Sequence, residues 1–98
     1  MMHFVSHSWQ VEDVEDGTVV KLSEADMQDA GLTDDLMELF LENGRPKLYL
    51  DLLDVRSMSS GVARKLFSLD GRVQKAGGRL VLCNLSTALN EALQARDL

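Results

Sequence analysis

Cysteine, histidine and long apolar runs are scarce in the sequence, and each scarcity excludes a class of protein. The single cysteine, Cys83, cannot form a disulfide within the chain, which predicts a reducing, cytoplasmic location. The two histidines, His3 and His7, both lie near the start, so the sequence shows none of the ligand spacings of zinc or calcium sites. The start also lacks the basic and apolar segments of a secretory leader, and no apolar stretch is long enough to cross a bilayer as a helix.

Positive charge is in deficit as well. The chain has 10 Lys and Arg against 16 Asp and Glu, its formal net charge is −6, and no basic cluster stands out. The electrostatic field of a protein with this negative net charge repels phosphate backbones and anionic lipid headgroups. Neither nucleic acid nor a membrane is therefore an expected partner. Apolar residues make up 45% of the 98 positions, which is enough for one folded domain. The predicted division is a flexible N-terminus, residues 1–8, and one domain, residues 9–98.

Motifs for enzymatic chemistry are also missing. The sequence contains no Cys-x-x-Cys, and Gly77-Gly78 follows a helical pattern where a phosphate-binding loop would open one. With both histidines at the start, no Ser–His or Cys–His nucleophile pair stands out. Cys83 lies in an apolar strand segment without a basic neighbour, which predicts a buried core residue and not a reactive thiol. We therefore expect neither catalysis nor a cofactor, and a small flavodoxin-like or thioredoxin-like enzyme is the least supported hypothesis.

The first half of the chain has the pattern of a hairpin followed by a helix. Residues 9–14 and 18–22 are strand-like and flank a turn, and residues 23–31 are polar and predict a surface loop. The period then changes to that of an amphipathic helix, with Thr33 as its expected N-cap and Gly44 just after its end.

The second half alternates strands and helices. A nearly continuous apolar run over residues 47–53 predicts a central strand covered on both faces, and a second helix is expected over residues 62–76. Another strand follows over residues 79–84, and Ser86 is the expected N-cap of a last helix. The order ββαβαβα predicts an α/β fold: a mixed sheet with an N-terminal antiparallel hairpin, parallel strands joined by right-handed crossovers, and helices packed on the sheet.

A hydroxyl-rich segment, residues 56–61, joins the predicted central strand to the second helix. In open α/β sheets, binding surfaces are commonly built at this place, beyond the carboxyl end of a strand. One interpretation is that Ser59 or Ser60 only caps the helix, a role worth about 1 kcal/mol. The other is that a serine here is phosphorylated, because the helix N-terminus tolerates added negative charge. The residues alone leave both interpretations open.

Two parts of the sequence resemble the STAS domain of anti-sigma factor antagonists. They are Leu50-Asp51-Leu52 with Val55, Met58-Ser59-Ser60 and Leu66, and the later run from Gly77 through Arg79-Leu80-Val81-Leu82-Cys83-Asn84 to Ser86. The similarity extends from about Trp9 to Leu98. It implies a bacterial regulator of transcription that binds an anti-sigma factor that is also a serine kinase, and so releases the sigma factor. Phosphorylation of one serine at a helix start would then break the complex.

The resemblance also implies which serine is the switch. Counted without gaps from Asp51, the family signature Asp-Ser-Ser/Thr-Gly falls on residues 59–62, which makes Ser60 the phosphoacceptor and Ser59 the fallback. This chain departs from the signature at the first, third and fourth of these positions. The partner-binding residues implied are Ser57, Met58, Ser59, Ser60, Gly61 and Arg64.

Family members usually continue into one more strand and an amphipathic helix, which are expected to be absent from a chain ending at Leu98. An exposed strand edge would then predict a homodimer or a partner that covers it, unless the chain is trimmed. A second functional hypothesis is an unphosphorylated scaffold of a larger signalling assembly, which predicts that Ser60→Asp leaves partner affinity almost unchanged.

Overall fold

The sheet starts with the hairpin that the sequence predicts. In the computed structural model, which describes residues 9–95, β1 (Gln10–Val14) pairs antiparallel with β2 (Gly17–Ser23). A two-residue turn joins the two strands. The predicted flexible N-terminus, residues 1–8, and both histidines lie outside the described residues.

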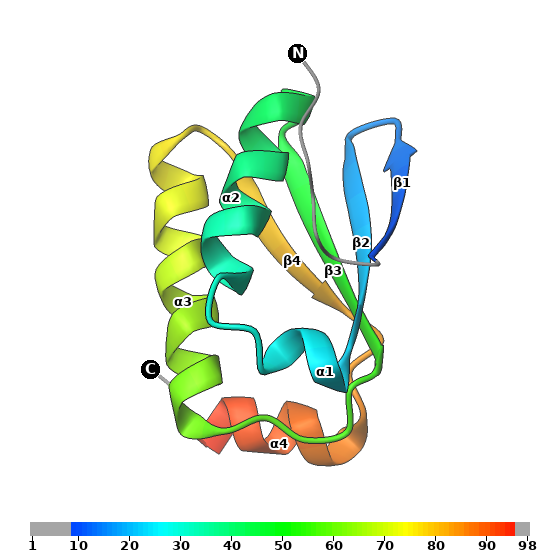
Figure 1. Ribbon diagram of the computed structural model, residues 1–98, viewed down its shortest axis with the longest axis vertical. Helices are drawn as coiled ribbons and strands as arrows, with labels where there is room; N and C mark the ends of the chain where they lie inside the picture. The colour runs from blue at the N-terminus through cyan, green and yellow to red at the C-terminus, as the bar shows by residue number, and fades with distance from the viewer. Residues whose placement is uncertain (1–8, 96–98) are drawn as a thin grey trace.

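Parallel strands complete the sheet in the order β1-β2-β3-β4 (Figure 1). β3 (Lys47–Asp54) pairs with β2 on one side and with β4 (Arg79–Cys83) on the other, so its predicted central place is confirmed. The crossovers carry α2 (Leu32–Asn43) and α3 (Ser60–Lys75), and both helices cover the same face (Figure 1). Because the sheet grows in one direction, two crossovers of the same hand place both helices on one side. The predicted mixed α/β sheet is confirmed.

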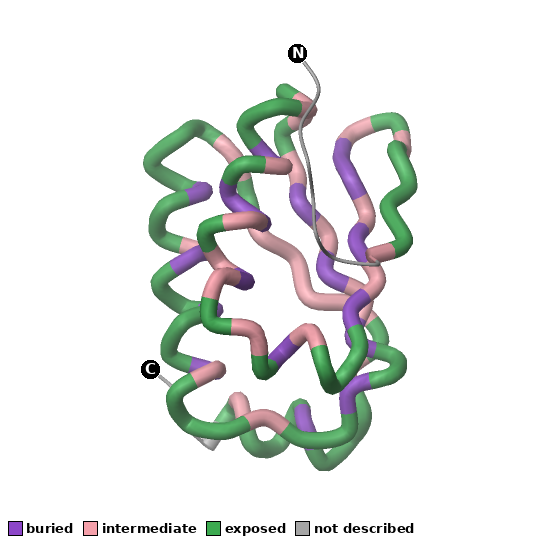
Figure 2. Tube along the Cα trace, viewed as in Figure 1, coloured by how far each residue is buried: buried purple, intermediate pink, exposed green. Residues whose placement is uncertain are grey.

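Within residues 9–95, the core therefore lies on one side of the sheet. Leu48, Leu50 and Leu52 of β3 are 0% exposed beneath the helices. Residues between them are half-buried, and Leu53 is 61% exposed. Figure 2 shows buried and half-buried positions alternating along β3. The expectation that β3 is covered on both faces is wrong, because its leucines at positions 48, 50 and 52 fill a single face. Tyr49 and Leu53 on the other face make the run look continuous in the sequence.

Residues 23–31, which the sequence pattern predicts as a surface loop, contain a one-turn helix, α1 (Glu24–Met27). Ser23 and Asp26 form a reciprocal capping box around its start, and Met27 is 4% exposed in the core. One turn is too short to show a hydrophobic period, which is why the pattern missed it.

The boundaries of α2 are predicted correctly at one end only. Gly31 is the N-cap, not Thr33, because the buried Leu32 belongs to the first turn and packs into the core. The helix ends at Gly44, whose φ of 66° is the left-handed conformation expected there.

The last two helices pack against different parts of the sheet: α3 covers its face beside α2, and α4 lies at the carboxyl end of the parallel strands (Figure 1). α3 buries Ala63, Leu66, Leu69 and Val73, and it begins two residues before the predicted start. α4 (Thr87–Ala95) lies across that end of the sheet (Figure 1), with the Ser86 hydroxyl accepting a 3.0 Å hydrogen bond from the Leu89 amide. The predicted N-cap of α4 is thus confirmed. Among residues 9–95, no helix combines the length and the apolar character that spanning a membrane requires.

Candidate protein-interaction site

The carboxyl ends of β2, β3 and β4 meet at one end of the domain, where all three continue into different segments (Figure 1). β2 runs directly into α1, β3 into the loop of residues 55–59, and β4 into the turn before α4. This loop, which we call the switch loop, and the first five residues of α3 hold all the site residues implied by the resemblance. The candidate site therefore lies on one short, continuous stretch of chain, residues 57–64, at this end of the domain.

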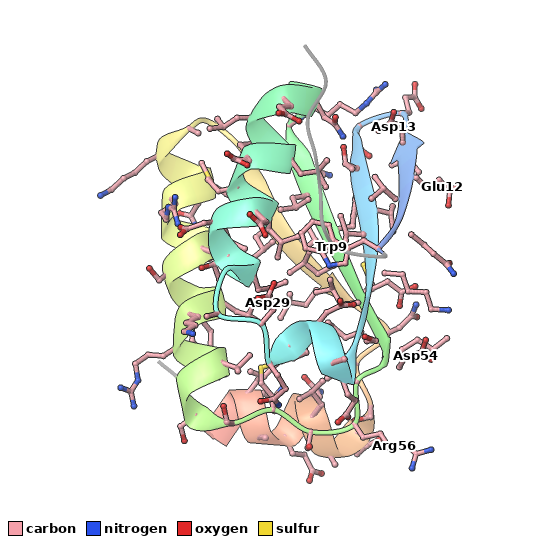
Figure 3. The ribbon with its side chains drawn as sticks, viewed as in Figure 1. Trp9, Glu12, Asp13, Asp29, Asp54 and Arg56 are labelled. Atoms are coloured by element: carbon pink, nitrogen blue, oxygen red, sulfur yellow. The ribbon has the colours of Figure 1, made fainter. Side chains whose placement is uncertain are left out.

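The switch loop is anchored at both of its ends. Val55 is 1% exposed, and its amide donates a 3.0 Å hydrogen bond to the Leu52 carbonyl. Met58 is half-buried and packs against the core. Arg56 and Ser57 between them are exposed, and the Arg56 side chain points away from the domain (Figure 3). The loop therefore presents the side chains of Arg56 and Ser57 to solvent, while that of Met58 is turned partly inward.

The two serines at the start of α3 have different environments. Ser59 is the N-cap: its backbone is extended, and its hydroxyl accepts a 3.1 Å hydrogen bond from the Val62 amide. Ser60 is the first residue of the helix and is exposed, and its hydroxyl makes no hydrogen bond within residues 9–95. Capping is therefore a sufficient role for Ser59 but explains nothing about Ser60.

The remaining implied contacts, Gly61 and Arg64, continue the same exposed surface along α3. Both are exposed, and Arg64 follows Ser60 by four positions, so the two side chains lie on one side of the helix. No ion pair of Arg64 is found in the part of the chain that the structure describes. Its guanidinium is available to an acidic or phosphorylated group on a partner.

A second contact fixes the neighbouring turn. The Asp51 carboxylate accepts hydrogen bonds from the Leu53 amide, at 3.0 Å, and from the Asn84 side chain, at 2.9 Å. Asn84 has a φ of 58°, which asparagine tolerates better than most residues. Asp51 and Asn84 both lie within the segments that carried the family resemblance, yet no local pattern indicated that they touch. This pair ties the turn before α4 to the end of β3.

Cys83, the single cysteine of the chain, ends β4 near this end of the domain. Cys83 is half-buried and is not part of the core cluster, so its expected place in the core is wrong: it lies on the face of the sheet that the helices leave open. Burial, together with the negative charge of Asp51, raises the pKa of its thiol, which disfavours the reactive thiolate. No group of three potential metal ligands occurs in residues 9–95.

Matched alanine substitutions should separate the two serines. Ser59→Ala is expected to lower the free energy of unfolding by about 1 kcal/mol, because it removes the acceptor for the Val62 amide. Ser60→Ala should change that free energy by less than about 0.5 kcal/mol, since it removes no hydrogen bond. Urea unfolding followed by circular dichroism measures both. Equal losses would contradict the assignment of the cap to Ser59.

The comparison with known families agrees with this architecture, a small α/β domain with a four-stranded mixed sheet. Residues 8–98 match the family model of the STAS domain, so the chain belongs to the STAS domain family. Members of that family are generally non-catalytic regulatory modules. A comparison with curated proteins finds no significant match.

Two solved structures share the fold. The NMR structure of the protein TM1081 superposes with a TM-score of 0.80 at 22% identity, over 100% of this chain and 80% of that one. A Ser-to-Glu variant of Moorella thermoacetica RsbS superposes with a TM-score of 0.75 at 19% identity, over 90% of this chain and 78% of RsbS. At this level of identity, both structures establish the fold and leave the function to be argued from the site.

Proposed function

We propose that this protein is an anti-sigma factor antagonist that binds an anti-sigma factor with serine kinase activity. The contact surface is the switch loop together with the first turns of α3, and phosphorylation of Ser60 breaks the complex. The observation that carries the proposal is the exposed Ser60 hydroxyl, which has no hydrogen bond within residues 9–95 and lies at the start of a 16-residue helix.

Local electrostatics favour Ser60 as a switch that leaves the fold intact. Phosphorylation adds nearly two negative charges, which the N-terminal end of a helix dipole stabilises. The first turn of α3 contains no acidic residue that would repel the phosphate. Because Ser59 already caps the helix, modifying Ser60 leaves the bond to the Val62 amide in place. The surface would change its charge while the domain stays folded.

Family membership and the structural neighbours support the same function. STAS domains are generally non-catalytic regulatory modules, and RsbS shares the fold with 19% identity. The RsbS structure carries glutamate in place of a serine and keeps this fold, which supports the expectation that the fold accepts added negative charge at a serine.

One feature of the signature favours a second candidate, an unphosphorylated scaffold of a larger signalling assembly. Ser59, Gly61 and Val62 stand where the resemblance places Asp, a second hydroxyl residue and Gly. A kinase that reads the Asp would find the neutral N-cap Ser59 there instead. A scaffold would use the same exposed surface without modification.

Phosphorylation by the kinase separates these candidates. The purified protein is incubated with ATP and a purified candidate anti-sigma factor kinase, and the modified residue is located by mass spectrometry. We expect one phosphate on Ser60, which is lost in Ser60→Ala and retained in Ser59→Ala. A chain that stays unmodified, or that is modified equally in both variants, contradicts the proposed switch.

A further inference from the structure

A polar contact joins α1 to the switch loop across a long separation in sequence. One carboxylate oxygen of Glu24, Oε2, accepts hydrogen bonds from the backbone amides of Arg56 and Ser57, at 2.5 and 3.3 Å. These partners lie 32 and 33 positions from Glu24 along the chain. Two successive amides that converge on one oxygen fix the orientation of both peptide groups.

The position of Glu24 is itself well defined. It is the first residue of α1, and the capping box holds the backbone around it: the Ser23 amide donates to the Asp26 carboxylate at 2.8 Å, and the Asp26 amide donates to the Ser23 hydroxyl at 3.3 Å. The buried Met27 anchors the other end of this single turn. Glu24 therefore holds the loop from a part of the fold that is already fixed.

The contact lies between the two anchors of the switch loop. Val55 is buried at its start and Ser59 caps α3 at its end, whereas Arg56 and Ser57 are exposed and are not part of the core cluster. Hydrogen bonds to a charged acceptor are stronger than those between neutral groups. Without Glu24, these two amides would face water and this part of the loop would sample other conformations.

We propose that Glu24 is a positioning residue that holds the switch loop in the conformation that a partner recognises. Its effect on loop order is independent of any partner, and only its effect on binding rests on the function proposed above. The exposed side of α1 is then part of the partner-binding surface, beside Arg56 and Ser57. Nothing in the sequence pattern assigns Glu24 such a role.

Loop order can be measured on the full chain without a partner. We expect Glu24→Ala to speed hydrogen exchange at the amides of Arg56 and Ser57, and trypsin cleavage after Arg56, by about tenfold or more. Exchange is followed by NMR, and cleavage is followed by mass spectrometry. Glu24→Gln keeps a neutral oxygen acceptor and should give an intermediate rate. Glu15→Ala, which removes an exposed carboxylate from the hairpin turn, is the matched control and should leave both rates unchanged.

The functional part of the proposal has its own readout. Glu24→Ala is expected to weaken binding to the anti-sigma factor kinase by about tenfold, with partial rescue in Glu24→Gln. A single cooperative urea transition in both variants would show that the domain stays folded. Unchanged exchange and cleavage in Glu24→Ala would overturn the positioning role, whether or not Ser60 is phosphorylated. Faster exchange with unchanged partner affinity would confine Glu24 to ordering the loop and overturn its role in recognition.

Discussion

Leu50→Ala is expected to lower the free energy of unfolding by about 3–4 kcal/mol, whereas Leu53→Ala should lower it by less than about 1 kcal/mol. The two leucines lie three positions apart in β3, on opposite faces of the same strand. Leu50 is 0% exposed in the centre of the core, so its truncation leaves a cavity that packed neighbours fill only in part. Leu53 is 61% exposed, so its truncation leaves no cavity in the core.

Urea unfolding measures both variants against the parent chain, with circular dichroism and the fluorescence of the single tryptophan, Trp9, as two probes of the same transition. Identical substitutions in one strand cancel differences in strand propensity to a first approximation. Similar losses for Leu50 and Leu53 would mean that both faces of β3 are covered in solution. That result would contradict a core confined to the face of the sheet that the helices cover.

The elements of this fold were largely accessible from sequence because their signals are local. The alternating leucines of β3, the period of α3 and the glycine after α2 each lie within a few residues of the structure that they specify. The errors come from features that a local pattern does not contain. One turn of helix at α1 has no period, and whether the second face of β3 is covered depends on where the crossover helices pack.

The candidate site likewise has features that local sequence signals predict and features that they do not. That the serine-rich segment would begin α3 was predictable, because serines between a strand and a helix are a local signal of a helix start. The contact of Glu24 with the amides of Arg56 and Ser57 was not, since it joins segments 32 and 33 positions apart and no sequence pattern pairs them. The same holds for the hydrogen bond between Asp51 and Asn84. Long-range polar contacts arise only once the sheet has brought the strand ends together.

Ser60→Glu should weaken binding to the anti-sigma factor kinase by at least about 30-fold, which corresponds to about 2 kcal/mol or more. The glutamate places a charge at the position of the proposed phosphate, and a complex that buries Ser60 would have to desolvate that charge without a prepared partner group. The fold should not suffer, because an anion in the first turn of α3 interacts favourably with the helix dipole. The urea midpoint of Ser60→Glu is therefore expected to equal or slightly exceed that of the parent chain.

Ser68→Glu is the matched control, because Ser68 is an exposed serine of the same helix about two turns further on. Its affinity for the kinase, measured by isothermal titration calorimetry, should stay within about twofold of the parent value because a single exposed surface charge contributes little. Ser60→Ala should also bind normally, since it removes the phosphoacceptor without adding charge. If Ser60→Glu binds as tightly as these two variants, then negative charge at the start of α3 does not control the complex, and the unphosphorylated scaffold becomes the better account of this surface.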